Sequence, residues 1–190
     1  MTCPFQFTIY NADQKSYRDL PIRYAETSTL FRNESSGEMH GLMRVRQFTI
    51  SEGHLVVTPE QLEEEFKDVI NLINYIMKTL GIENDITYRF SKWDPSDKDK
   101  YIDNAEAWAE TESKMKDILD HLGINYKTAI GEAAFYGPKL DLQFKNVHGK
   151  EDTIITVQID FALPERFDMT YVDKDGVKKR PYVIHRTSIG

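Results

Sequence analysis

The sequence predicts an α+β protein in which an antiparallel β-sheet is flanked by helices. Strand-like segments outnumber helical ones, the connections between them are short, and no repeat or low-complexity linker interrupts the chain. Short connections favour antiparallel pairing, because parallel strands need long crossovers. The 190 residues, 40% of them apolar, are sufficient for one domain with a hydrophobic core.

The first predicted element is a hairpin formed by residues 20–34 and 42–50. Both segments are rich in residues that favour strands, and the stretch "SSGEMHG" between them has the small and polar residues of a loop. Alternation along the second strand places Arg44, Arg46 and Phe48 on one face. The hairpin is therefore expected to carry a cationic face edged by an aromatic ring.

Two amphipathic helices and one strand follow. Thr58, Pro59 and Gln61 form a capping-box pattern before the first helix, and Gly81 ends it. Residues 85–93 predict a strand, and residues 104–123 predict the second helix. The buried stripes are expected to comprise Leu62, Phe66, Val69, Ile70, Ile73, Ile76, Met77 and Leu80 in the first helix, and Trp108, Met115, Ile118, Leu119 and Leu122 in the second.

The last part of the chain predicts two further hairpins. Residues 139–147 and 153–163 alternate in polarity on either side of the turn "HGKED". Residues 169–186 form another strand pair with Asp175-Gly176 at its turn. These hairpins complete the predicted sheet.

Composition limits the cellular location of the protein and the partners it can bind. The net charge of −7 argues against nonspecific nucleic-acid binding over the whole surface but is compatible with a local basic cleft. A single cysteine, Cys3, excludes an internal disulfide framework and fits a reducing compartment. No apolar run is long enough for a membrane span, and the N-terminus lacks the pattern of a signal peptide. A cytoplasmic protein is predicted.

The cationic hairpin has two interpretations. Its arginines can pair with nearby glutamates on an exposed strand face that binds nothing, since such pairs are common and weak. Alternatively, guanidinium groups bind phosphate oxygens and an aromatic ring stacks on a nucleobase, which predicts a polyphosphate site. The chain contains neither of the glycine-rich phosphate-binding fingerprints. Chemistry alone leaves both interpretations open.

A set of segments resembles the class II aminoacyl-tRNA synthetases, and specifically the threonyl-tRNA synthetases. The segment "FRNESSGEMHGLMRVRQFT" is similar to motif 2 of that class. The resemblance implies the class II catalytic core fold, and an enzyme that activates threonine with ATP and transfers it to threonine tRNA. The other matching segments, in family order, are "MTCP", "SYRDLPIRYAE", "GHLVVTPEQ", "AFYGPKLDL", "VQIDFALPERF" and "RPYVIHR".

The resemblance assigns ATP-binding roles to motif 2 residues. It implies that Arg32 holds the α-phosphate and the reacting carboxylate, which makes Arg32 the expected catalytic residue. Glu34 is expected to bind the adenine amino group, Arg44 the γ-phosphate, and Phe48 the adenine ring by stacking. ATP bound in this way needs Mg²⁺, whose protein ligands the sequence does not identify.

The resemblance also implies one Zn²⁺ per chain, bound by Cys3, His54 and His185. Their spacing alone predicts no metal site, and a buried thiol with two ordinary histidines would be the simpler interpretation. Three protein ligands leave an open coordination position. In the family, the amino group and hydroxyl of threonine bind that metal, so valine is rejected for lack of a hydroxyl, whereas serine requires editing elsewhere.

Four further residues match threonine-contacting positions of the family. These are Tyr136, Gln158, Glu52 and, less specifically, Lys139. Glu52 stands where the family pattern has an aspartate, so its contact with the threonine hydroxyl involves one additional methylene.

The domain prediction is a partial class II catalytic domain covering residues 1–190. It lacks motif 1, which builds the homodimer in this class, and the second half of motif 3, and it contains no editing or anticodon-binding domain. The chain alone is therefore expected to be weakly active at most. An alternative is a truncated paralogue that binds threonine, zinc or ATP without turnover. A synthetase for serine or proline would require a vestigial metal site.

Overall fold

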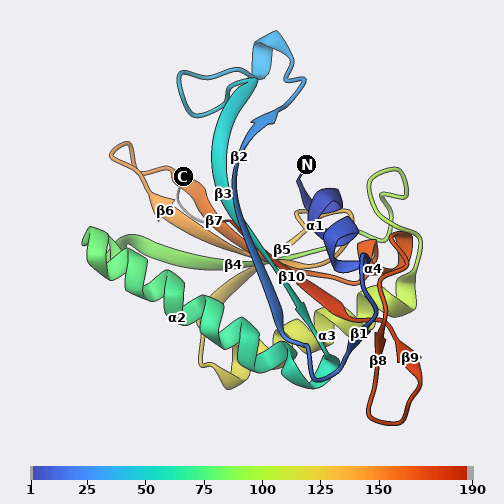
Figure 1. The fold of residues 1–190 in the computed structure, drawn as a ribbon. Helices are drawn as coiled ribbons and strands as arrows, with labels where there is room; N and C mark the ends of the chain where they lie inside the picture. The colour runs from blue at the N-terminus through green and yellow to red at the C-terminus, as the bar shows by residue number, and fades with distance from the viewer. Residues whose placement is uncertain (1, 188–190) are drawn as a thin grey trace.

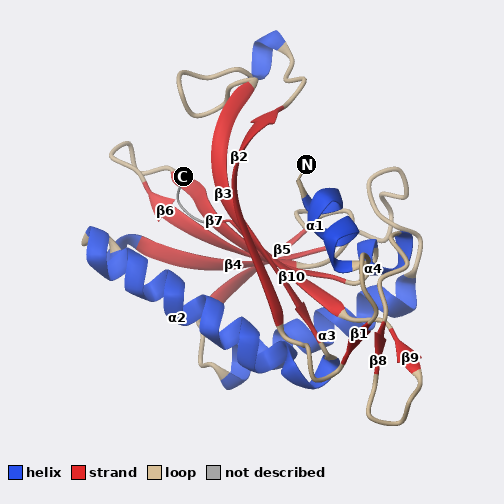
Figure 2. Cartoon of the chain, in the orientation of Figure 1, coloured by secondary structure: helices blue, strands red, loops and turns tan. Residues whose placement is uncertain are grey.

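The computed structural model describes residues 2–187 and confirms the predicted α+β class. A seven-stranded sheet has the order β2-β3-β10-β7-β6-β4-β5, and helices lie on both of its faces (Figures 1 and 2). The helices are α1 (Cys3–Tyr10), α2 (Leu62–Leu80), α3 (Ala105–His121) and α4 (Leu163–Arg166). The strands of the large sheet are β2 (Ile22–Phe31), β3 (Gln47–Val57), β4 (Ile86–Lys92), β5 (Tyr126–Ile130), β6 (Lys139–Lys145), β7 (Glu151–Asp160) and β10 (Tyr182–Thr187).

Neighbouring strands of the large sheet are antiparallel except β4 and β5. These two pair in parallel because α3 connects them as a crossover. The sequence analysis missed β5, whose five residues do not alternate clearly. A small second sheet comprises β1 (Lys15–Ser16), β8 (Tyr171–Val172) and β9 (Lys178–Lys179).

The first predicted hairpin exists as β2 and β3, but its second strand was placed too early. Strand β3 begins at Gln47, not at residue 42, and continues to Val57 because it pairs with β10 on its other side. Residues 32–46 form a loop that contains a 3-10 turn at Ser36–Glu38 with a capping box. Arg44 and Arg46 therefore lie in this loop, and the prediction that they share a strand face with Phe48 was wrong.

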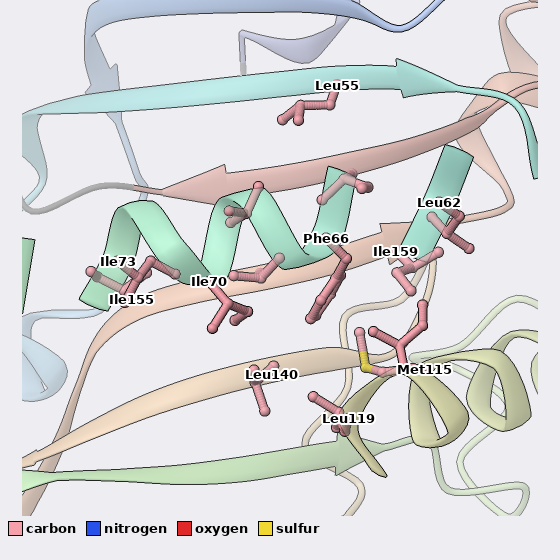
Figure 3. Close-up of a cluster of buried hydrophobic side chains, with 14 of the residues drawn as sticks. Leu55, Leu62, Phe66, Ile70, Ile73, Met115, Leu119, Leu140, Ile155 and Ile159 are labelled. Carbon is pink, nitrogen blue, oxygen red and sulfur yellow. The ribbon is translucent and has the colours of Figure 1, made fainter. Parts of the chain in front are cut away.

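The core between the sheet, α2 and α3 follows the predicted stripes closely. Thr58 and Gln61 form the expected capping box, and Gly81 ends α2 in the left-handed conformation, with φ of 72°. Leu80 was assigned to the buried stripe but is 54% exposed, because it lies in the last turn beyond the sheet. Figure 3 shows how side chains from α2 and α3 interdigitate with those of the strands beneath them. No helix among the described residues is long and apolar enough to cross a membrane.

A second core lies on the opposite face of the sheet, beneath α1. Phe7 and Tyr10 of this helix pack against Val56 and Val183, whose chain neighbours point into the first core. The sequence analysis did not predict α1, although Pro4 occupies its first turn, where proline is favoured. Helix α1 brings the N-terminal segment over the centre of the sheet (Figure 1).

The predicted hairpin of residues 169–186 is divided between the two sheets. β8 and β9 pair across a turn in which Gly176 has φ of 80°, as the Asp175-Gly176 pattern predicts. Residues 182–187 do not continue this pairing. They form β10, which lies between β3 and β7 in the large sheet. This insertion places His185 beside His54.

Candidate metal and amino-acid site

Three elements distant in sequence bring Cys3, His54 and His185 together. Cys3 begins α1, while the two histidines lie opposite each other in the register of β3 and β10. All three are buried, and one ligand atom from each lies within 4.8 Å of the others. The sulfur of Cys3 is 3.1 Å from His54 Nε2 and 3.8 Å from His185 Nδ1. The structure thus brings together the three residues expected to bind zinc.

The donor set fits a zinc ion. In a tetrahedral site with Zn–S at about 2.3 Å and Zn–N at about 2.0–2.1 Å, neighbouring donor atoms lie about 3.3–3.6 Å apart. The sulfur–nitrogen separations of 3.1 and 3.8 Å bracket this range. Thiolate sulfur and imidazole nitrogen are also both suitable donors for zinc. Coordination would require side-chain adjustments, because the three donor atoms are within 4.8 Å of one another and not all at the tetrahedral separation.

Hydrogen bonds fix the outward-facing nitrogen of each histidine. His54 Nδ1 lies 2.7 Å from Gln6 Oε1, and His185 Nε2 lies 2.7 Å from Asp160 Oδ2. Each acceptor takes the ring proton on its own side, which leaves the nitrogen nearer Cys3 free to bind a metal. Asp160 is itself held by the backbone N–H groups of Ala162 and Leu163, which donate to its other oxygen at 2.9 Å.

The two histidines differ in proton affinity. Burial, with a smaller contribution from His185, lowers the pKa of His54 to about 3. Burial also acts to lower the pKa of His185, but the hydrogen bonds to Asp160 and Cys3 and the charge of Asp160 outweigh it and raise that pKa to about 9. In the absence of a metal, His54 is therefore neutral at pH 7, whereas His185 carries a second proton on the nitrogen nearer Cys3, which a bound metal would displace.

A cavity of about 490 Å³ extends from this cluster to Arg32. Cys3 and His185 line it near the cluster, whereas His54 is not among its lining residues. All four residues expected to contact threonine also line it. One cavity is therefore lined by two of the expected zinc ligands, by the four residues expected to contact threonine, and by Arg32, which is expected to bind the α-phosphate.

Glu52 carries an unusual carboxylate in this cavity. Burial raises its pKa, and nearby Glu26 raises it further, against the opposing effect of His185. Its Oε1 atom is buried and has no hydrogen-bond partner within residues 2–187. An unpaired buried acceptor favours a ligand that donates a hydrogen bond, such as a hydroxyl or an ammonium group.

Tyr136, Gln158 and Lys139 surround the rest of the cavity. The Tyr136 hydroxyl donates to Gln158 Oε1, and the Tyr136 ring stacks on His185 with centroids 4.9 Å apart. Burial, followed by the charge of Asp160, raises the pKa of Tyr136, so its hydroxyl remains protonated. Lys139 is paired with Asp141 at 3.2 Å and supplies a positive charge at the wall.

The expected ATP-binding residues are only partly brought to the cavity. Arg32 lines it and stacks on Phe48, with the guanidinium carbon 4.9 Å from the ring centroid. Glu34, Arg44 and Phe48 do not line it. Arg44 donates two hydrogen bonds to Glu34 Oε2, at 3.1 and 3.2 Å, and lies 3.5 Å from Glu38. Arg44 is thus paired with glutamates, as the first interpretation of the hairpin expected. Arg32, in contrast, lines the cavity and is available to a ligand.

The sequence analysis missed two residues that the site depends on. Gln6 and Asp160 orient the histidines, but neither carried a local signal. Gln6 lies in a helix that was not predicted, and Asp160 ends a strand whose periodicity indicates only that it is buried. The three-dimensional register alone places them beside His54 and His185.

Comparisons with known proteins agree with this architecture. The chain is 75% identical over all 190 residues to a threonine–tRNA ligase of Clostridium botulinum (strain Eklund 17B), and it spans only 30% of the length of that relative. It also covers 46% of the chain in a crystal structure described as the RNA binding domain of threonyl-tRNA synthetase from Cryptosporidium parvum, with a TM-score of 0.89 and 36% identity. A threonyl-tRNA synthetase structure from Aeropyrum pernix matches with a TM-score of 0.79, 29% identity and 44% of that chain covered. In each case all of this chain is matched.

The family assignment rests on a match that extends along the whole chain. Residues 1–190 match the family described as the class II core domain of tRNA synthetases for G, H, P, S and T. The large sheet, antiparallel except for β4 and β5, and the helices on its two faces agree with that match. The chain belongs to the class II tRNA synthetase core domain family.

Proposed function

We propose that residues 1–190 are part of a catalytic domain that activates threonine with ATP and passes it to threonine tRNA. The observation that carries this proposal is that one cavity of about 490 Å³ is lined by Cys3 and His185 and also by Arg32. Such a space can hold an amino acid and the α-phosphate of ATP next to each other, and proximity alone can supply much of the rate enhancement. The 75% identity to a threonine–tRNA ligase supports threonine as the amino acid.

Threonine specificity would depend on the metal cluster and its neighbours. Cys3, His54 and His185 would hold Zn²⁺, which when bound supplies an open coordination position for the amino group and hydroxyl of threonine. Glu52 Oε1, buried and unpaired within the described chain, would accept a hydrogen bond from the same ligand. Valine cannot make these polar interactions and would leave the buried groups unsatisfied.

Arg32 would act on the reacting groups. A threonine carboxylate oxygen forms a bond to the α-phosphorus while the bond to pyrophosphate breaks, so two anions must approach each other. The Arg32 guanidinium can bind oxygens of both groups and neutralise their charge, and no protein nucleophile is needed. Mg²⁺ would accompany ATP.

The remaining motif 2 residues would bind the nucleotide after a local rearrangement. Arg32 covers one face of Phe48, so adenine would stack on the other face or displace the guanidinium. The Arg44 side chain is 53% exposed despite its pairing with Glu34 and Glu38, and it can still reach a phosphate. The pairing would then serve to keep the loop in order before ATP binds.

Threonine-dependent exchange of pyrophosphate into ATP tests the proposal. We predict that Arg32→Ala in the complete enzyme abolishes exchange while the circular dichroism spectrum stays unchanged, because the charge it removes matters most in the transition state. Arg166→Ala, at an exposed arginine of α4, is the matched control and should retain the wild-type rate.

Three results would contradict the proposal. Exchange by Arg32→Ala at the wild-type rate would remove Arg32 from the mechanism. If the wild-type chain bound threonine and ATP but showed no exchange, even as part of the longer protein, the alternative of a module that binds without turnover would be favoured. A preference for serine or proline in the same assay would exclude threonine as the substrate.

A further inference from the structure

The His54 ring faces two different partners. Nε2 lies 3.1 Å from the sulfur of Cys3, and Nδ1 lies 2.7 Å from Gln6 Oε1. A neutral imidazole carries one proton, so one nitrogen donates and the other accepts. Only an unprotonated Nε2 can bind a metal beside Cys3. The proton must therefore reside on Nδ1.

Gln6 alone cannot enforce this arrangement. A glutamine side chain presents an oxygen acceptor at one corner and an NH₂ donor at the other, and it can exchange them by rotation. If the NH₂ group faced His54, Nδ1 would have to accept, and the proton would move to Nε2, where it would block the metal position. Gln6 is only 4% exposed, so water cannot freely compensate for a wrong orientation.

Glu26 decides the orientation of Gln6. The Gln6 NH₂ group donates to Glu26 Oε2 at 3.0 Å. An ionised carboxylate only accepts hydrogen bonds, so the NH₂ end of Gln6 must face Glu26 and the oxygen end must face His54. The chain of contacts runs from β2 through α1 to β3.

We propose that Glu26 is a positioning residue for the metal cluster, because through Gln6 it fixes His54 in the tautomer that leaves Nε2 free. The inference rests on the proposed metal-binding function. His185 differs, since Asp160 contacts its ring directly and needs no intermediate. Asp160 thus orients His185 directly, whereas Gln6 orients His54 and is itself oriented by Glu26.

The first test replaces Glu26 with alanine in metal-free protein. Long-range ¹H–¹⁵N NMR on histidine-labelled protein reports which ring nitrogen of His54 carries the proton. We expect the Nδ1–H form in the wild type, and a mixture or the Nε2–H form in Glu26→Ala. Affinity for Co²⁺, measured by competition with a chromophoric chelator, should fall about 10- to 100-fold. Thr27→Ala, at the exposed neighbouring position of β2, should change neither readout.

The second test is a rescue that a merely structural role would not show. Gln6→Glu in the Glu26→Ala background places an acceptor-only side chain against His54, so no second residue is needed to orient it. We expect this double variant to regain the Nδ1–H tautomer and the wild-type affinity for Co²⁺. Failure of the double variant to recover the Nδ1–H form would overturn the inference.

The outcomes separate this inference from the proposed function. A fall in Co²⁺ affinity in Glu26→Ala with the His54 tautomer unchanged would reduce Glu26 to a charge effect and overturn the inference alone. Wild-type protein that binds neither Co²⁺ nor Zn²⁺ would refute the metal site itself, and with it the inference that depends on it.

Discussion

At the scale of single residues, the candidate site depends on the orientation of neutral polar groups. Cys3 and His185 are 182 residues apart in sequence, and Cys3 and His54 are 51 apart, so their spacing contains no information about a metal. The resemblance of short segments identified them, but it could not identify Gln6, whose role depends on a contact between α1 and β3. Residue types can be predicted from a motif, whereas the partners that orient them require the fold.

The first prediction at this scale concerns His54. In the complete enzyme, we expect His54→Ala to lower bound zinc and threonine affinity together. ATP binding should stay near the wild-type value, because Arg32 is positioned on the Phe48 ring and needs no metal for this contact. Elemental analysis measures the metal, and calorimetry measures both ligands. His148→Ala, at an exposed loop position, is the control. Normal threonine affinity in a zinc-free His54→Ala protein would limit the metal to a structural role.

A second prediction concerns Gly137, next to Tyr136 in the cavity wall. A Cβ atom at this position would lie 1.8 Å from the carbonyl oxygen of Ile159, so the backbone must move. We expect Gly137→Ala to lower the free energy of unfolding by about 1–3 kcal/mol. Threonine affinity should also fall as Tyr136 is displaced. Gly37→Ala, where a Cβ has no neighbour within 4 Å, should alter neither quantity in urea denaturation and calorimetry.

At the scale of elements, α2 and α3 were predicted well because their signals are local. A capping box, a periodic stripe and a terminal glycine all act within one helix. β10 is the opposite case: Pro181 marks a break before residues 182–187, but no local feature indicates which strands that segment pairs with. Only pairing with β3 and β7 decides where that segment lies. Strands whose partners are distant in sequence are the ones that local reasoning assigns incorrectly.

The prediction at this scale tests the α2 core. Phe66 is completely buried, and we expect Phe66→Ala to reduce the free energy of unfolding by about 3–5 kcal/mol, from lost transfer energy and the resulting cavity. Leu72 lies on the same helix but is 41% exposed, and Leu72→Ala should cost much less. Equilibrium urea denaturation measures both. Equal losses would indicate that another segment buries Leu72.

At the scale of the whole molecule, Cys3, His54 and His185 bring together segments that pack in different parts of the hydrophobic core. Cys3 belongs to α1 and the smaller core, whereas the histidines lie on central strands shared by both cores. A metal bound to all three would fix α1 to the sheet. The fold class was predictable from the order of elements, but this cross-connection was not, because α1 itself was missed.

A bound metal should therefore raise the stability of the whole chain. A ligand at 100 times its dissociation constant that binds only the folded state adds about 2.7 kcal/mol, which for a chain of this size corresponds to a rise of roughly 5–11 °C in Tm. We expect zinc to produce such a rise in the wild type and none in Cys3→Ser, whose hydroxyl is a poor zinc ligand. Differential scanning calorimetry with and without zinc measures both, and His148→Ala should respond as the wild type does. An equal rise in Cys3→Ser would place the stabilising ion elsewhere, because that variant lacks the sulfur that joins α1 to the two strands.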